Sequence, residues 1–155
     1  MSFVVLHVLH LVTAVVWGGG SIFVALILFP SLARLPAAQA QAVLTRIAPL
    51  AGVVMGLTGF GVLLTGVLRA WWGGGIASLG DLATPYGVLV SLSFVLTFVI
   101  TGFEGMFRQR MRRMMDQPEE YARRAPGLAR RNAVLTTAGF AAILLMMGLL
   151  GTGTY

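Results

Sequence analysis

The chain has 155 residues, of which 57% are hydrophobic and only 10% are charged, and its formal net charge is +6. A soluble domain of this size needs far more charge to cover its surface, so the composition excludes an ordinary water-soluble protein. All eleven positive residues are arginines that lie between apolar runs, so we expect them to meet anionic lipid headgroups rather than nucleic acid. The lack of cysteine excludes disulfides, thiolate metal sites and cysteine nucleophiles.

The first two apolar runs predict membrane-spanning helices at residues 3–29 and 48–69, since a crossing needs about 20 apolar residues. The first run lacks a basic leader and a convincing cleavage site, so we interpret it as a retained helix that stops at Pro30. Both helices carry small residues at short intervals, which permit close helix packing in lipid. These residues are Ala14, Gly18, Ser21 and Ala25 in the first helix and Gly52, Gly56, Gly59 and Gly66 in the second.

The third and fourth predicted helices cover residues 86–107 and 133–151, and the arginine-rich segment 108–131 joins them. We expect the third helix to continue past the membrane as far as Met115, before a break at residues 116–118. The rest of the segment predicts a short amphipathic helix on the membrane surface. No strand pattern competes with these helices, and a backbone in lipid must satisfy its own hydrogen bonds.

Arginine is distributed very unequally between the two sides of this predicted bundle. Ten of the eleven arginines lie in the two connections on one side, and Arg69 lies on the other. Positive loops stay in the cytoplasm, so both termini are predicted to lie outside it, in an N-out/C-out orientation. The sequence therefore predicts an all-α, polytopic four-helix bundle that forms one domain over residues 1–155 in a bacterial inner membrane. The expected partners are the lipid bilayer and anionic lipids at its inner face, and the small-residue faces leave a homodimer open.

Two histidines are the main candidates for chemistry, because ionisable groups at membrane depth are rare and often functional. His7 and His10 lie one turn apart on the first helix, with His10 about 10 Å below its outer end. Imidazole is the commonest metal ligand, and thioethers complete sites for copper or haem iron. Met146 and Met147 lie at a compatible depth, which allows two ligand arrangements. In the first, His10 and a methionine across the bundle bind the metal. In the second, His10 or His7 binds it together with the same histidine of a second copy in a dimer. The structural alternative is a histidine bonded to the backbone and methionines that only fill space.

A further ionisable group, Glu104, lies near the inner end of the third helix. We interpret it as part of a structural ion pair with Arg34, Arg46 or Arg108 rather than as a proton carrier. On the opposite side, Arg69 ends the second helix near the depth of the histidines.

The first helix also carries a recognisable motif. Residues 9–19, LHLVTAVVWGG, resemble the first-helix signature of the copper-resistance D (CopD) family and its small relatives. The four helices, and the arginine-rich run at residues 105–113, resemble the HemJ-type protoporphyrinogen oxidases. In that family a first-helix histidine is implicated in binding haem b, which implies the same role for His10. A lysine on a later helix also matters there, and this chain has no lysine, so the resemblance does not imply oxidase activity.

We therefore expect an integral membrane protein that binds haem b through a first-helix histidine, for electron transfer or haem handling. The predicted cofactor site consists of His10, His7, Trp17, Ala14, Gly18 and Arg69, in which the alanine and the glycine leave room for a flat macrocycle. The alternative is a copper-binding or copper-transport protein of the CopD type, with the metal ligands His10, His7, Met146 and Met147. A structural membrane subunit without a cofactor is the third hypothesis, and the sequence does not decide whether the protein is an enzyme.

Overall fold

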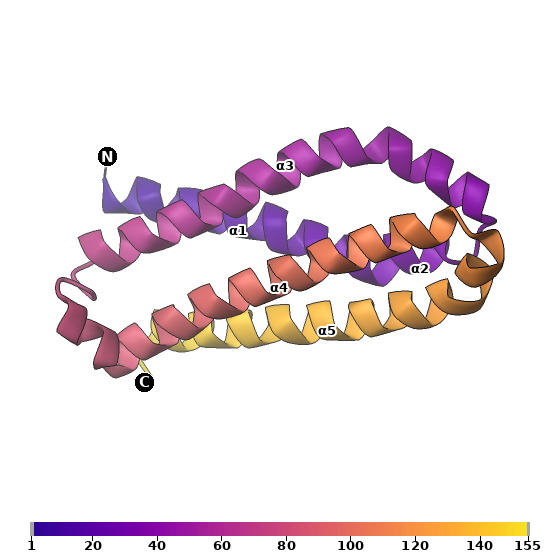
Figure 1. Cartoon of the computed structure of the whole chain (residues 1–155). Helices are drawn as coiled ribbons and strands as arrows, with labels where there is room; N and C mark the ends of the chain where they lie inside the picture. The colour runs from indigo at the N-terminus through magenta and orange to yellow at the C-terminus, as the bar shows by residue number, and fades with distance from the viewer. Residues whose placement is uncertain (1, 155) are drawn as a thin grey trace.

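Four helical rods run side by side along the molecule in the computed structural model, which describes residues 2–154 (Figure 1). The first rod consists of α1 (Phe3–Phe23), the π-helical turn η1 (Val24–Leu28) and α2 (Phe29–Leu32). The other rods are α3 (Ala37–Trp72), α4 (Pro85–Met115) and α5 (Pro118–Thr152), with a 3₁₀ turn, η2 (Leu79–Ala83), before α4. All four rods are long and apolar enough to cross a membrane, and no strand occurs in residues 2–154. The predicted all-α bundle of four helices is confirmed.

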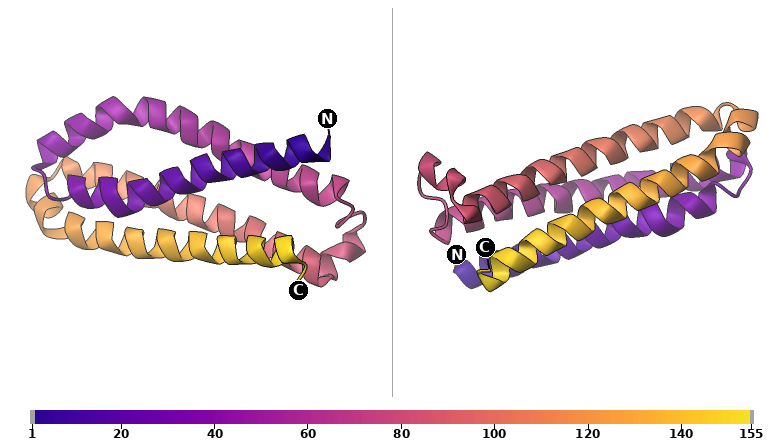
Figure 2. Two further views of the ribbon diagram at one scale, coloured as in Figure 1. Left: turned by 180° about the vertical axis from the view of Figure 1, so that it is seen from behind. Right: turned by 90° about the horizontal axis from the view of Figure 1, so that it is seen from below.

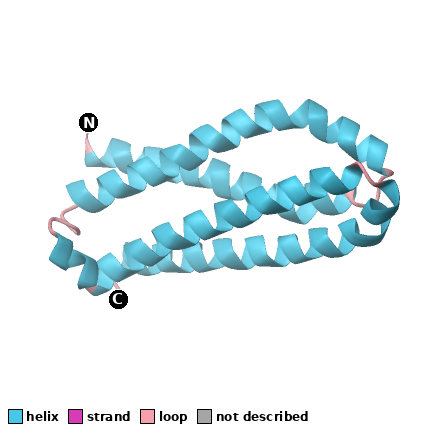
Figure 3. Ribbon diagram, in the orientation of Figure 1, coloured by secondary structure: helices cyan, strands magenta, loops and turns pink. Residues whose placement is uncertain are grey.

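The two ends of the bundle differ in charge. One end, which we call the arginine end, holds residues 33–36 and 108–131. The N- and C-termini lie together with η2 at the other end, the termini end (Figure 2). Loops occur only at these two ends (Figure 3). Helix α1 packs mainly on α3, and α4 packs mainly on α5. The contact between α3 and α4 is small. Helix α3 bows away from α4 near the arginine end (Figure 1).

The first rod continues past Pro30, where the sequence predicted that it would stop. Proline lacks an N–H, and in a regular α-helix its ring collides with the carbonyl four residues earlier. Here the backbone widens into η1, and the N–H of Phe29 donates to the carbonyl of Val24, five residues back. Pro30 then lies in the first turn of α2, where a missing N–H is tolerated, and the rod ends at Leu32.

The long helices also differ from the prediction at their arginine ends. Helix α3 begins at Ala37 rather than at residue 48, because the added stretch is rich in alanine and glutamine, which favour helix. Residues 119–131 are not a separate surface helix, since they form the first part of a continuous α5. The predicted continuation of α4 to Met115 and the break before Pro118 are confirmed.

A large buried cluster at the arginine end explains why these segments are helical. Along the last turns of α4 the methionines are buried and the arginines between them are exposed, which is the pattern of a helix with one apolar face. This face packs on α2 and on the start of α5. The buried members of the cluster are Phe29, Leu32, Ala33, Ala37, Ala40, Phe107, Met111, Met114, Met115, Tyr121, Ala125 and Ala129.

Two contacts fix the geometry of this cluster. The rings of Phe29 and Phe107 meet edge to face, with centroids 4.6 Å apart. The buried Tyr121 hydroxyl donates to the carbonyl of Leu32 at 2.8 Å, which ties α5 to the last turn of the first rod.

At the termini end, one carboxylate organises the connection between α3 and α4. Asp81 Oδ2 accepts the backbone N–H groups of Ser78 (2.7 Å) and Ala77 (2.9 Å) and the Ser78 hydroxyl (3.0 Å). These hydrogen bonds, led by the Ser78 backbone, lower the pKa of Asp81 below its ordinary value. The Thr84 hydroxyl then accepts the N–H of Gly87 and caps α4.

We expect Tyr121→Phe to destabilise the protein by about 1 kcal/mol, because the Leu32 carbonyl loses its donor while the ring packing stays. Thermal unfolding of the purified protein in detergent measures the loss. Arg123→Gln, at an exposed position of the same helix, is the control and should leave the midpoint unchanged. Equal midpoints for Tyr121→Phe and the wild type would contradict a stabilising role for this hydrogen bond.

Candidate functional site

The imidazole of His10 is buried against α3 near the termini end. Its Nδ1 lies 3.0 Å from the hydroxyl oxygen of Thr65, and that hydroxyl lies 2.5 Å from the carbonyl of Gly61. A threonine hydroxyl has one hydrogen to donate, and the Gly61 carbonyl takes it. His10 Nδ1–H is therefore the donor to Thr65, which leaves the lone pair of the neutral ring on Nε2.

The other ionisable residues of the predicted site lie close to His10. The charge of Arg69 acts on the His10 ring, and His7 lies one turn earlier on the same helix. Both of these side chains are half-buried, and each holds a buried nitrogen without a hydrogen-bond partner, Nε in Arg69 and Nδ1 in His7. The polar groups of this region are thus incompletely satisfied by the described residues, as at a site that receives a further group.

The apolar members of the predicted site are packed rather than open. Trp17 is buried, and its ring lies edge to face with Phe140, 5.0 Å between centroids. A side chain at Gly18 would meet Phe140 at 3.2 Å, so Phe140 fills the space that the sequence assigned to a macrocycle. Ala14 is half-buried on the same rod. A flat ligand therefore cannot lie against Gly18 unless Phe140 moves.

The two predicted methionine ligands are half-buried on α5. The sulfur of Met146 lies 3.7 Å from the Ser93 hydroxyl oxygen of α4, whose one hydrogen is donated to the Leu89 carbonyl at 2.8 Å. No group of three or more His, Asp or Glu side chains that could hold a metal ion occurs in residues 2–154. The structure therefore brings His10 together with Thr65 of α3, and Met146 together with Ser93 of α4.

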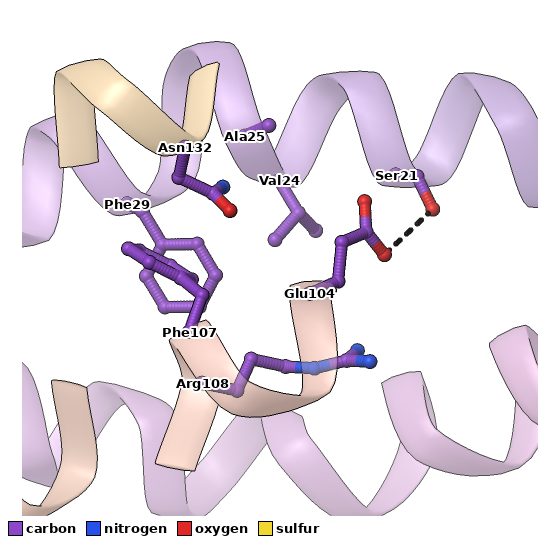
Figure 4. A pocket seen from close by; sticks show the side chains of 8 residues that line it. All are labelled: Ser21, Val24, Ala25, Phe29, Glu104, Phe107, Arg108 and Asn132. Atoms are coloured by element: carbon purple, nitrogen blue, oxygen red, sulfur yellow. Dashed lines mark hydrogen bonds between the residues drawn. The ribbon is translucent and has the colours of Figure 1, made fainter. Parts of the chain in front are cut away.

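A polar cluster that the sequence missed lies towards the arginine end (Figure 4). The Ser21 hydroxyl of α1 donates to Glu104 Oε2 of α4 at 3.4 Å, and both residues line a void of about 10 Å³ with Asn132 of α5. Asn132 is only 2% exposed, and its Oδ1 has no hydrogen-bond partner. A void of this size holds about one water molecule, and three polar groups suit such a guest.

Three arginines were predicted as possible partners for Glu104. Of these, Arg108 is the one whose charge acts on the Glu104 carboxylate. Within residues 2–154 no ion pair closer than 4.0 Å involves Glu104. The predicted structural pair is therefore present only as an attraction between Glu104 and Arg108 at more than 4.0 Å. Asn132 escaped notice because the fourth helix was expected to begin after it, whereas α5 carries it into the bundle.

Beside this cluster lies a cavity of about 1100 Å³ between the first rod, α3 and α4. Its position also explains the glycines of α3. Gly59 and Gly66 face Trp17 and His10 closely, as the prediction of close packing requires, whereas a side chain at Gly52 or Gly56 would meet nothing within 4 Å. Half of the predicted packing stripe therefore faces open space.

No protein-family model, curated protein or solved structure matches the chain. The likeness of the first helix to the CopD and HemJ-type families stays a prediction from its motif.

We expect Thr65→Val to lower the free energy of unfolding by about 1–3 kcal/mol, because the buried His10 N–H loses its acceptor. Thr65→Ser, which keeps the hydroxyl, is the matched control and should lose much less. Unfolding in detergent compares the two variants, and equal losses would contradict the assignment of Nδ1 as donor.

Proposed function

We propose that this protein is a multi-pass membrane protein that binds haem b for electron transfer or haem handling, and that His10 would hold the haem iron. The observation that carries the proposal is the hydrogen bond from His10 Nδ1 to Thr65. A histidine that ligates a metal nearly always donates its other ring N–H in this way, which fixes the ring and directs Nε2 to the metal. The resemblance to the HemJ-type family, in which a first-helix histidine is implicated in binding haem b, supports the same role.

Arg69 and Thr65 have distinct parts in this proposal. Thr65 holds the imidazole in one tautomer and one orientation. Arg69 has an unpartnered Nε–H beside His10, which suits the carboxylate of a propionate. Haem itself supplies the one-electron redox chemistry.

A second protein group would also hold the iron. His7 is the only other histidine in the chain, so a pair of histidine ligands needs His7 or a second copy of the protein. Copper binding has weaker support, because no group of three or more His, Asp or Glu side chains that could hold a metal ion occurs in residues 2–154. We keep copper as an outcome of the spectroscopic test.

We further propose that the arginine end faces the cytoplasm and the termini end the exterior of a bacterial inner membrane. The support is the arginine distribution, since positively charged loops resist translocation. Anionic lipids would then lie against the arginine end.

The haem proposal predicts a Soret absorption band in the detergent-purified protein, from cells supplied with haem, that is lost in His10→Ala. His7→Ala tests the second ligand, since loss of the band would assign that role to His7 and a retained band would point to a second copy of the protein. Gel filtration establishes that each variant is folded. A wild-type protein without a Soret band, or with copper in its place by metal analysis, would overturn the haem assignment.

The orientation is testable because the natural chain has no cysteine. A membrane-impermeant maleimide should label Leu79→Cys, at the exposed position of η2, in intact cells. Arg123→Cys, exposed at the arginine end, should react only after the membrane is opened. The reverse pattern would mean that the arginine end lies outside.

A further inference from the structure

The cavity between α3 and α4 has walls that suit a hydrocarbon chain. Its part farther from the arginine end is lined by apolar or small residues of α1 and α3, among them Trp17, Met55, Gly52 and Gly56. The two glycines, and Gly105 on the facing side of α4, leave open space where side chains would stand. With a volume of about 1100 Å³, the cavity exceeds what a few water molecules fill.

The part of the cavity at the arginine end is polar and positively charged. Arg108, Arg112 and Arg113 of α4 line it, with Glu104 and Asp116 as its acidic members. The one ion pair in residues 2–154 joins Arg124 to Glu120, outside the cavity, so the three lining arginines keep their donors available. Arginine binds phosphate through several N–H groups at once, and basic pockets between membrane helices bind acidic headgroups.

We propose that this cavity is a binding site for one anionic phospholipid. Its phosphate binds Arg108 and Arg112, and one acyl chain runs along Gly52 and Gly56 of α3. The arrangement matches charge to headgroup and apolar wall to chain, each at the depth where a lipid in the same leaflet presents them. A second copy of the protein is a poorer occupant, because its own arginines would meet those of the first. The proposal does not depend on haem binding.

Trp17 reports directly on the occupant because it lines the cavity. Trp71→Phe and Trp72→Phe, both at exposed positions, leave it as the only tryptophan. This full-length protein is placed in vesicles that contain phosphatidylglycerol or phosphatidylcholine with brominated acyl chains, which quench nearby tryptophan. The measurement is made with and without His10→Ala, so that bound haem does not contribute to the quenching.

We expect brominated phosphatidylglycerol to quench Trp17 at a much lower mole fraction than brominated phosphatidylcholine. Arg108→Gln with Arg112→Gln should raise the required mole fraction about thirtyfold, since each of the two arginines near an anionic surface contributes about 1 kcal/mol. The matched control is Arg123→Gln with Arg131→Gln, which removes the same charge at exposed positions outside the cavity and should have little effect. Gly52→Leu should reduce the quenching by filling the acyl part, and it keeps the test decisive if the arginine variant fails to fold.

Four results would overturn the proposal. Equal quenching by the two headgroups would mean ordinary boundary lipid, and an equal effect of the control pair would mean general charge attraction. Competition by inorganic phosphate would point to a soluble anion. Cross-links between two copies through α3 and α4, with no lipid quenching, would make the cavity an interface between protomers.

Discussion

Hydrocarbon offers no hydrogen-bond partner to a peptide group, so a chain that crosses it must satisfy each N–H and carbonyl within its own helices. The four rods are long and apolar enough to cross a membrane, and two of their features satisfy this constraint: loops occur only at the two ends of the bundle, and Pro30 is accommodated by a π-turn rather than a break. Lipid also removes most of the hydrophobic drive for helices to associate. Close packing must then hold the apolar length together, and it is uneven here, firm between α1 and α3 and slight between α3 and α4.

At the arginine end, the helices associate for a different reason. There the helices of the bundle extend past their most apolar stretches, and burial of apolar surface from water again favours association. A buried cluster holds the helices together at this end. It consists of the methionine face of α4, the alanines of α5 and the Tyr121 hydrogen bond. With this cluster at one end and the α1–α3 contact at the other, the bundle has room for an opening between them. The cavity occupies that opening.

The sequence predicted the number and type of helices because a long apolar run in lipid has one stable conformation. It did not predict the start of α3 or that α5 is one continuous helix. Hydropathy marks only the apolar stretch of a helix, and polar turns can extend the helix beyond that stretch. Residues 37–47 and 119–131 are helical because they bury small faces in a tertiary cluster.

The candidate site divides in the same way. His10 was found from its rarity at membrane depth, whereas its partner Thr65 lies fifty-five positions away and only the fold joins them. Gly52 and Gly59 look alike in sequence, yet one faces open space and the other faces Trp17.

The π-turn determines how far the two halves of the first rod are rotated relative to each other. A π-turn accommodates about one residue more than a regular turn, and each residue of an α-helix advances the chain by about 100°. The turn at Val24–Leu28 therefore sets the angular phase between the half of the rod that presents His10 and the half that presents Leu32. Deleting one residue there would restore a regular helix and rotate His10 away from Thr65, while Leu32 kept its place beside Tyr121. The π-turn thus lets one continuous rod present His10 to α3 and Leu32 to α5, each in the correct orientation.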